Sequence, residues 1–298
     1  MQNLKGFSKG LFASKEDVRK ATADLDIQWN KYTRGSVLII GGSFEWKGAA
    51  EMAFYAANNA LAALRTVSGY VTFAASKKML EAASIRSSVF VLNELNGNAD
   101  HDIKTIGSIR HDSLVMGPGI PKEGVSRGLL RKIISLEKKK KNMIVIDAAM
   151  IGVMANNKSL INEGMILTPH AGEFRKLTGK NLKNKSIKEK INAVKEFTSK
   201  YNCTLVLKGH ETIISDGKRL KINISKTPAL ATMGTGDVLC GIIASYAASH
   251  KDPFESAVAG VYVHSAIGDL LFKSKGEHII ATDIIDAIPK VIKEFDKR

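Results

Sequence analysis

The sequence predicts an α/β protein with a mostly parallel central sheet. Seven short apolar runs recur along the chain, most of them rich in β-branched residues, which is typical of strands buried on both faces. Longer stretches with helical spacing lie between several runs, and this alternation predicts parallel strands joined by crossover helices. The expected strands are residues 37–40, 70–73, 88–92, 113–116, 143–146, 165–167 and 204–207.

Composition and apolar spacing predict the main helices. Three of them are expected to follow strands, at residues 48–65, 125–141 and 185–200. After the last parallel strand the alternation stops, and residues 211–215 and 219–224 predict a β-hairpin with Asp216 and Gly217 at its turn. Three more helices are expected near the end of the chain, at residues 236–250, 253–273 and 281–295.

The composition indicates a folded chain with one main domain. Of its 298 residues, 44% are hydrophobic and 24% are charged, close to the averages of globular proteins. No linker, low-complexity segment or repeat divides the chain, so we expect a helical arm over residues 1–30 and one domain over residues 31–298. Two cysteines exclude a disulfide framework and fit the reducing cytoplasm. With no bilayer-length apolar run and no signal-peptide pattern, no membrane contact is expected.

The net charge of +15 makes nucleic acid the first partner to consider. The basic residues gather at Lys138 to Lys141 and between Lys176 and Lys190, with no aromatic residue among them. Aromatic residues make up only 6% of the chain, too few for a stacking platform, so a solvated surface is favoured over nucleic-acid binding. A positive field also attracts phosphorylated small molecules.

Glycines and ionisable residues follow most of the expected strands. Ligands of open α/β sheets bind beyond the carboxyl ends of the strands, so these segments are expected to share one rim. The segments are Gly41-Gly42-Ser43 with Lys47-Gly48-Ala49, then Gly117-Pro118-Gly119, Asp147, Thr168 to Glu173, and Lys208 to Thr212.

The segment Gly234-Thr235-Gly236-Asp237 opens an apolar helix. Glycines there let a ligand approach the unpaired N–H groups, which together with the helix dipole favour phosphate. Asp237 is either a helix-capping carboxylate or a general base that takes a proton from a substrate hydroxyl. Neither a Walker A motif nor a protein-kinase glycine loop is present.

Simpler roles stay open for the other candidates. His170 is either a capping residue or a substrate contact, and Glu173 has the position of a helix-start acid. Lys208 is either a surface lysine or a phosphate contact, and its place directly after a buried run favours the second. The histidines lack metal-site spacing, so no metal ion bound by protein ligands is expected.

Several motifs resemble those of known families. Gly234 to Asp237 with the following helix resembles the anion-hole motif of the ribokinase-like superfamily, whose fold is a three-layer α/β/α sandwich. From residue 35 to residue 292 the chain is similar to the NAD(P)H-hydrate dehydratase family. The motifs that carry this similarity are residues 37–43 with Gly48-Ala49, Thr168-Pro169-His170 with Glu173-Phe174, Leu207-Lys208-Gly209 with Thr212, Val263-His264 with Gly268-Asp269, and Ala281-Thr282-Asp283 with Ile288-Pro289.

The resemblance implies a carbon–oxygen lyase that repairs hydrated NADH or NADPH. Such enzymes phosphorylate the 6-hydroxyl group of the damaged nicotinamide ring with ADP or ATP, and phosphate then leaves. Mg²⁺ would be carried by the phosphates of the nucleotide. The resemblance implies a catalytic set of Asp237 as the base with Gly234, Thr235 and Gly236; substrate contacts from Ala49, Gly117, Gly119, His170 and Asp237; and nucleotide contacts from Lys208, Gly209, His210, Glu211, Thr212 and Gly236.

The resemblance also implies partners, and the sequence departs from the family in two places. A homo-oligomer, a tetramer, is implied, as is a separate epimerase, because the chain has no room for the epimerase domain of fused relatives. Ala149 replaces an acid that the family usually has, and no His precedes Gly35. Two alternatives stay open: a kinase of the same superfamily acting on a vitamin precursor or sugar alcohol, and a non-catalytic nucleotide- or nucleic-acid-binding protein.

Overall fold

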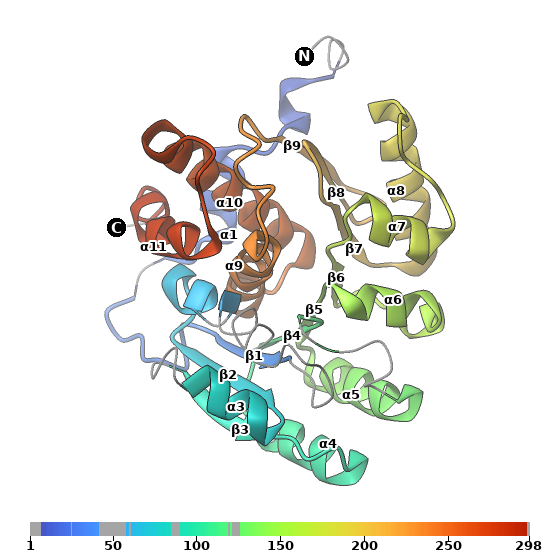
Figure 1. Cartoon of the computed structure of the whole chain (residues 1–298), viewed down its shortest axis with the longest axis vertical. Coiled ribbons are helices and arrows are strands. Elements are labelled where there is room, and N and C mark those ends of the chain that lie inside the picture. Colours follow the sequence, from blue (N-terminus) through green and yellow to red (C-terminus); the bar gives the residue numbers. More distant parts are fainter. Residues whose placement is uncertain are drawn as a thin grey trace.

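The computed structural model describes residues 7–24, 26–41, 58–59, 61–84, 90–118, 120 and 126–296. In this part of the chain one sheet holds nine strands in the order β3-β2-β1-β4-β5-β6-β7-β8-β9 (Figure 1). β1 to β7 are parallel, and β8 and β9 extend the sheet as an antiparallel hairpin. The strands are β1 (Ser36–Ile40), β2 (Tyr70–Ala75), β3 (Val91–Glu94), β4 (Ser113–Met116), β5 (Met143–Ile146), β6 (Met165–Leu167), β7 (Thr204–Leu207), β8 (Glu211–Ser215) and β9 (Leu220–Ile224).

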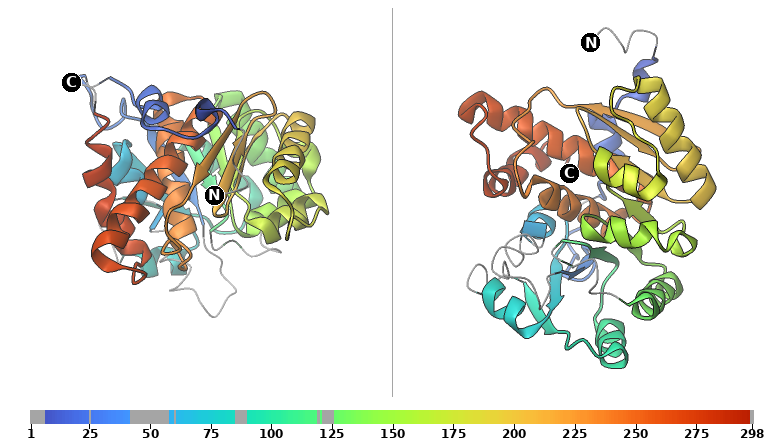
Figure 2. Two further views of the ribbon diagram at one scale, coloured as in Figure 1. Left: turned by 90° about the horizontal axis from the view of Figure 1, so that it is seen from above. Right: turned by 45° about the vertical axis from the view of Figure 1, so that its right-hand side comes forward.

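Helices cover both faces of this sheet (Figure 2). They are α1 (Lys15–Ala21), α3 (Lys77–Ser84), α4 (Ala99–Ser108), α5 (Arg127–Lys140), α6 (Ala149–Ala155), α7 (Ala171–Thr178), α8 (Ile187–Tyr201), α9 (Thr235–His250), α10 (Pro253–Lys275) and α11 (Ala281–Ile292), with short 3₁₀ turns η2 (Lys9–Leu11) and η3 (Lys158–Leu160). Residues 58–59 and 61–66 are also helical. The predicted α/β fold with a mostly parallel sheet is therefore confirmed.

The period of two along each strand divides the core between the two faces. Leu38 and Ile40 of β1 pack in the cluster that includes α4 to α8. Val37 and Ile39 pack on the other face, in the cluster that includes α9 and α10. α9 is buried along most of its length because α10 and α11 cover its outer side. A helix with no polar stripe is typical of such a central position.

The predicted boundaries differ from the observed ones mainly at the edges of the sheet. The strand expected at 88–92 is β3, which runs from Val91 to Glu94, and residues 85–89 lie outside the described ranges. Val91 is an exposed residue on an edge strand. Because an edge strand is less buried than a central one, its apolar residues do not mark where the strand begins and ends. Most of the helix expected at 48–65 also lies outside the described residues. The last helix ends at Ile292 rather than 295.

The segment before β1 lies along β9, the outer strand of the hairpin (Figures 1 and 2). The N–H group of Ala13 donates to the carbonyl oxygen of Ile222 at 2.9 Å, and Phe12 forms a parallel bridge with the same residue. Asp17 of α1 pairs with Lys221 at 2.9 Å. These contacts cover part of the free edge of β9.

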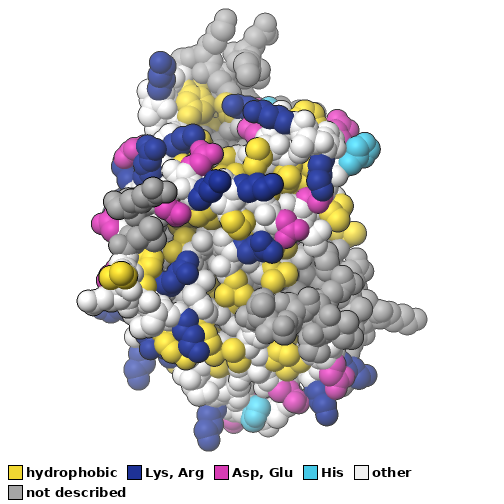
Figure 3. All heavy atoms as spheres, turned by 90° about the vertical axis from the view of Figure 1, so that its left-hand side faces the viewer, with side chains coloured by type: hydrophobic (Ala, Val, Ile, Leu, Met, Phe, Trp, Pro, Cys, Tyr) yellow, Lys and Arg dark blue, Asp and Glu magenta, His cyan; other side chains and the backbone are white. Residues whose placement is uncertain are grey.

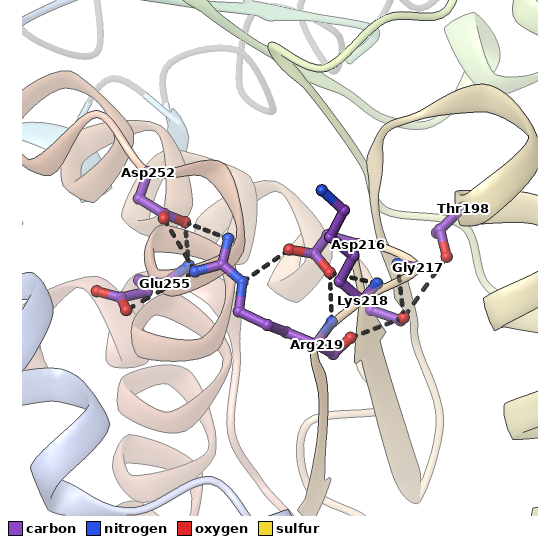
Figure 4. A network of polar contacts seen from close by, with 8 residues as sticks. Thr198, Asp216, Gly217, Lys218, Arg219, Asp252 and Glu255 are labelled. Atoms are coloured by element: carbon purple, nitrogen blue, oxygen red, sulfur yellow. Dashed lines mark hydrogen bonds and ion pairs between the residues drawn. The ribbon is translucent and has the colours of Figure 1, made fainter.

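Arg219 joins the hairpin to the start of α10 (Figure 4). Its Nε donates to Asp216 at 2.7 Å, and its terminal nitrogens donate to Asp252 at 2.9 and 3.1 Å. Asp252 also caps α10 by accepting from the N–H group of Glu255, whose carboxylate lies 3.8 Å from the guanidinium. The Phe254 ring centroid is 4.5 Å from the guanidinium carbon. We call Asp216, Arg219, Asp252 and Glu255 the Arg219 cluster.

Charged side chains are dispersed on the face that carries α10 and α11. Figure 3 shows Lys and Arg scattered among acidic and hydrophobic side chains rather than joined in a continuous stripe. Within the described ranges, none of the helices combines the length and apolar character needed to cross a membrane.

Candidate active site

The carboxyl ends of five parallel strands meet at one edge of the sheet. Gly41 follows β1, Gly117 follows β4, Asp147 follows β5, Thr168 follows β6 and Lys208 follows β7. Because these strands are parallel neighbours, their ends share a rim, as the sequence predicted.

α9 begins at the same rim. A Cβ added to Gly236, in its first turn, would lie 3.6 Å from the Nζ atom of Lys208. Gly234, the N-cap, has φ 86°, a left-handed conformation that glycine adopts freely. The hydroxyl oxygen of Thr235 lies 2.7 Å from the carbonyl oxygen of Leu230 and 2.8 Å from that of Thr232. The hydroxyl group therefore donates to the preceding loop. The first N–H groups of α9 therefore face the rim with the positive end of the helix dipole, as an anion site requires.

A cavity of about 690 Å³ opens beside the start of α9. Its lining brings together seven of the predicted residues: His170, Lys208, Gly209, His210, Thr212, Thr235 and Gly236. The remaining wall comes from the loop between β9 and α9, from Asn223 of β9 and Leu239 of α9, and from three residues of α10: Val261, His264 and Ser265. This volume falls in the range of small-molecule sites.

The sequence pattern did not predict that the loop between β9 and α9 lines the cavity. This loop includes Lys226, Thr227, Pro228, Leu230 and Thr232. Its position between the hairpin and the glycine segment was the available signal, since that loop must pass the rim to reach α9.

Lys208 and Asp147 form a close ion pair across the ends of β7 and β5. The Nζ atom donates to Oδ1 of Asp147 at 2.7 Å, and the Thr168 hydroxyl lies 2.7 Å from the same oxygen. Burial alone would raise the pKa of Asp147, but Lys208 and the hydrogen bonds hold this pKa below its usual value. Burial would lower the pKa of Lys208, yet the charge of Asp147 raises it. Both groups are therefore ionised at neutral pH.

Asp237 is half-buried in the first turn of α9. Burial, together with the negative charge of Asp147, raises the pKa of Asp237 to about 8. Lys208 and a hydrogen bond from the Asn59 side chain act in the opposite direction. No ion pair joins Asp237 to another described residue. A carboxyl group whose pKa lies near neutrality is suited to accept a proton.

His170 and Glu173 act as a pair at the start of α7. Nδ1 of His170 accepts from the N–H groups of Gly172 and Glu173 at 2.9 and 3.3 Å, so this side chain caps the helix. The Glu173 carboxylate accepts from the N–H group of His170 at 2.9 Å, completing the capping box. The capping role of both residues is confirmed, and His170 lies on the cavity wall as well.

The other predicted residues divide into three groups. Gly117 approaches the end of β5 so closely that a Cβ there would overlap the carbonyl oxygen of Asp147, and its φ of 145° suits glycine. Glu211 pairs with Lys190 at 3.6 Å and is absent from the described lining of the cavity. Ala49 and Gly119 lie outside the described residues.

Two further residues near the rim have unusual surroundings. His264 of α10 is buried, interacts with the backbone of Thr235, and has its pKa lowered by burial to about 4. Its imidazole is therefore neutral. Ala148, directly after Asp147, has φ 49° and ψ −128°, a strained conformation for a residue with a Cβ. Ala149 begins α6. Among the described residues, no group of three or more His, Cys, Asp or Glu side chains could hold a metal ion.

Sequence comparisons find similarity to one family along most of the chain. A family model described as NAD(P)H-hydrate dehydratase matches residues 37–290. An ADP-dependent (S)-NAD(P)H-hydrate dehydratase of Cenarchaeum symbiosum is 30% identical over 293 residues, covering 95% of this chain and 96% of the relative. A bifunctional NAD(P)H-hydrate repair enzyme Nnr of Pyrobaculum aerophilum is 34% identical over 273 residues, 89% of this chain and 52% of that protein. The chain thus spans about half the length of such bifunctional relatives.

Solved structures share the fold along almost the whole chain. A ribokinase-like superfamily protein from Enterococcus faecalis has a TM-score of 0.81 at 23% identity and covers 98% of this chain and 99% of its own. The ADP/ATP-dependent NAD(P)H-hydrate dehydratase from Bacillus subtilis, co-crystallised with ATP and Mg²⁺, has a TM-score of 0.77 at 23% identity, with 97% and 100% covered. The ribokinase-like sandwich predicted from the sequence is confirmed.

Proposed function

This chain belongs to the NAD(P)H-hydrate dehydratase family, and we propose that it restores NADH or NADPH from their hydrated forms with ADP or ATP as phosphoryl donor. The damaged nicotinamide ring carries a 6-hydroxyl group. Hydroxide is a poor leaving group at neutral pH, so the hydroxyl must first be converted to a phosphate ester.

The first step is phosphoryl transfer at the start of α9. Asp237 accepts the proton of the 6-hydroxyl group. At the same time the oxygen of that hydroxyl group bonds to the terminal phosphorus of the nucleotide. The bond from that phosphorus to the bridging oxygen breaks, and AMP or ADP leaves. The N–H groups of α9 and the ammonium group of Lys208 stabilise the charge on the transferred group.

The second step is elimination of phosphate. The lone pair of the ring nitrogen expels phosphate from its carbon, and a proton leaves the neighbouring ring carbon, which restores the reduced nicotinamide. Mg²⁺ would be carried by the phosphates of the nucleotide rather than by protein ligands, and it would neutralise part of the charge on the donor. The loop from Lys226 to Thr232 and α10 enclose the cavity that would hold this nucleotide.

The placement of Asp237 carries the proposal. Its carboxyl group lies in the first turn of α9, its pKa is raised to about 8 by burial and Asp147, and no described cation pairs with it. A capping carboxylate would instead be expected to be ionised well below neutral pH. Asp237 therefore has the properties expected of a general base.

The family assignment favours the dehydratase over a kinase of the same fold. A kinase would share Asp237 and the anion site and release a stable phosphate ester. We further propose that the chain acts in the cytoplasm as a homo-oligomer. It would depend on a separate epimerase for the other epimer of the hydrate. The bifunctional name of the longer relatives supports that functional link.

The test offers hydrated NADH, magnesium and either ADP or ATP to the protein. The expected result is recovery of reduced-nicotinamide absorbance with one AMP or ADP formed for each NADH restored. A phosphate ester that accumulates without recovery of absorbance would instead establish the kinase. Absence of both products from folded protein would contradict the proposal.

A further inference from the structure

A second carboxylate lies behind the proposed base, and the mechanism above gives it no part. Asp147 is only 3% exposed, at the end of β5. Its Oδ1 lies 2.7 Å from both the Lys208 ammonium and the Thr168 hydroxyl, and the N–H group of Ala148 also donates to its carboxylate. A carboxylate so well supplied with donors is a poor proton acceptor, so Asp147 is not an alternative base.

What Asp147 controls is the position of an ammonium group. Lysine has a flexible four-carbon stem, and an unrestrained Lys208 would distribute its charge over many rotamers. The bond to Asp147 instead directs Nζ toward Gly236 at the start of α9. The ammonium group of Lys208 donates one hydrogen bond within the described residues, to Asp147. Its other N–H groups are left for a ligand in the cavity.

Thr168 fixes the carboxylate in turn. Its hydroxyl lies between Asp147 and the end of β5, 3.2 Å from the carbonyl oxygen of Ile146, and 3.6 Å from Sγ of Cys240 in α9. The chain of contacts therefore runs from β6 to β5 to β7 and ends at the first turn of α9.

We infer that Asp147, oriented by Thr168, is a positioning residue that holds the Lys208 ammonium group against the start of α9 to receive the phosphates of the donor nucleotide. The inference rests on the proposed function. It adds an effect on the base, since the negative charge of Asp147 also favours the protonated form of Asp237. Among the described residues, the other titratable groups near this site include Glu173 of α7, His170 before it, His210 on the cavity wall, Cys240 of α9 and His264 of α10.

The central test is Asp147→Asn, compared with wild type by calorimetric titration with Mg-ADP and by the pH dependence of kcat/KM. Without the carboxylate, Kd and KM for ADP are expected to rise about tenfold, since a charged hydrogen-bond partner of Lys208 is lost. The acid limb of kcat/KM is expected to move to lower pH by about one unit, because a negative neighbour of Asp237 is removed. A merely structural role would change the unfolding temperature and leave the acid limb in place.

Glu137→Gln is the matched control at the other end of β5. Glu137 is also a buried carboxylate and accepts from His111 and Asn142, the residue before β5, both at 2.8 Å. This variant is expected to lower the unfolding temperature and to keep the ADP affinity and the pH profile of wild type. Thr168→Val, which removes one donor to Asp147, is expected to move Kd in the same direction by less and keeps the test open if Asp147→Asn does not fold.

Unchanged ADP affinity and an unchanged acid limb in folded Asp147→Asn, or in Thr168→Val if the first variant does not fold, would overturn the inference. If wild type binds ADP but restores no NADH, the proposed function fails, while weaker ADP binding by the variants still supports the inference. If wild type binds neither ADP nor ATP, both fail.

Discussion

Two clusters of charge lie at opposite ends of the sheet, and each surrounds one cation with carboxylates. The Arg219 cluster lies beside the starting end of β7, where β8 ends. The second, which we call the rim cluster, comprises Asp147, Lys208 and Asp237 at the carboxyl ends of the strands. The two clusters differ in how much of their hydrogen-bonding capacity is used within the protein.

In the Arg219 cluster the bonding capacity is used within the protein (Figure 4). The guanidinium donates to two carboxylates, and both carboxylates also accept backbone N–H groups. In the rim cluster, Lys208 has one described hydrogen bond from its ammonium group, and Asp237 forms no ion pair with a described residue. Unused capacity beside a cavity distinguishes a functional cluster from a structural one better than charge density does.

Asp237→Asn tests whether the rim cluster contains the general base. Loss of a general base is expected to lower kcat by about 10²- to 10⁴-fold. Mg-ADP binding, measured by calorimetry, should change little, because Lys208 and the N–H groups of α9 remain. Turnover of hydrated NADH at the wild-type rate would show that Asp237 is not the base.

The pH dependence of wild-type activity tests the raised pKa of Asp237. Because only the ionised form of Asp237 accepts a proton and its pKa is raised to about 8, kcat/KM is expected to rise with pH and to level off above about 8. The measurement is initial rates at several pH values with a constant ionic strength. An acid limb near pH 4 would mean that the burial of Asp237 does not perturb it in solution.

The same shift affects stability with a defined sign. The folded state binds the Asp237 proton more strongly than the unfolded chain does. The contribution of the protonated Asp237 carboxyl group to the free energy of unfolding is therefore fully present below about pH 4. It is lost as the pH rises through about 8.

Arg219→Ala tests the structural cluster. It is expected to lower the free energy of unfolding by about 1 kcal/mol, because the network is partly exposed, and to leave kcat and KM unchanged. Urea denaturation with parallel kinetic assays provides the measurement. A large loss of activity at unchanged stability would remove the distinction between the clusters.

Ala148→Gly tests the strained backbone directly after Asp147. Glycine relieves the strained φ of 49° but adds freedom to the unfolded chain, so a net stabilisation of about 0.5 to 1 kcal/mol is expected. Thermal unfolding is the measurement, and Ala155→Gly at the end of α6 provides the control. Destabilisation by Ala148→Gly as large as that by Ala155→Gly would show that Ala148 carries no strain.

The sequence predicted the central fold well for a physical reason. β4, β5, β6 and β7 coincide with their predicted ranges because strands buried on both faces are continuously apolar. β3 was displaced because an edge strand carries no such pattern. The boundary between the arm and the domain stays a prediction, as do the roles of the site residues.

The candidate site was predictable only in part. Glycines and charges after strands revealed the rim, since parallel strands bring their ends together. The contact between Lys208 and Asp147, 61 positions apart, depends on strand order, which local pattern does not encode. The contribution of Asn59 had no sequence signal, and that of His264 was visible only as a family motif.

The contact between Ala13 and Ile222 bears on how copies of this chain behave at high concentration. An outer strand offers a row of backbone donors and acceptors on which another polypeptide can assemble. The segment around Phe12 occupies part of that row on β9. Removing it would expose a template for intermolecular sheet growth, so the segment around Phe12 is expected to limit self-association of the chain through β9.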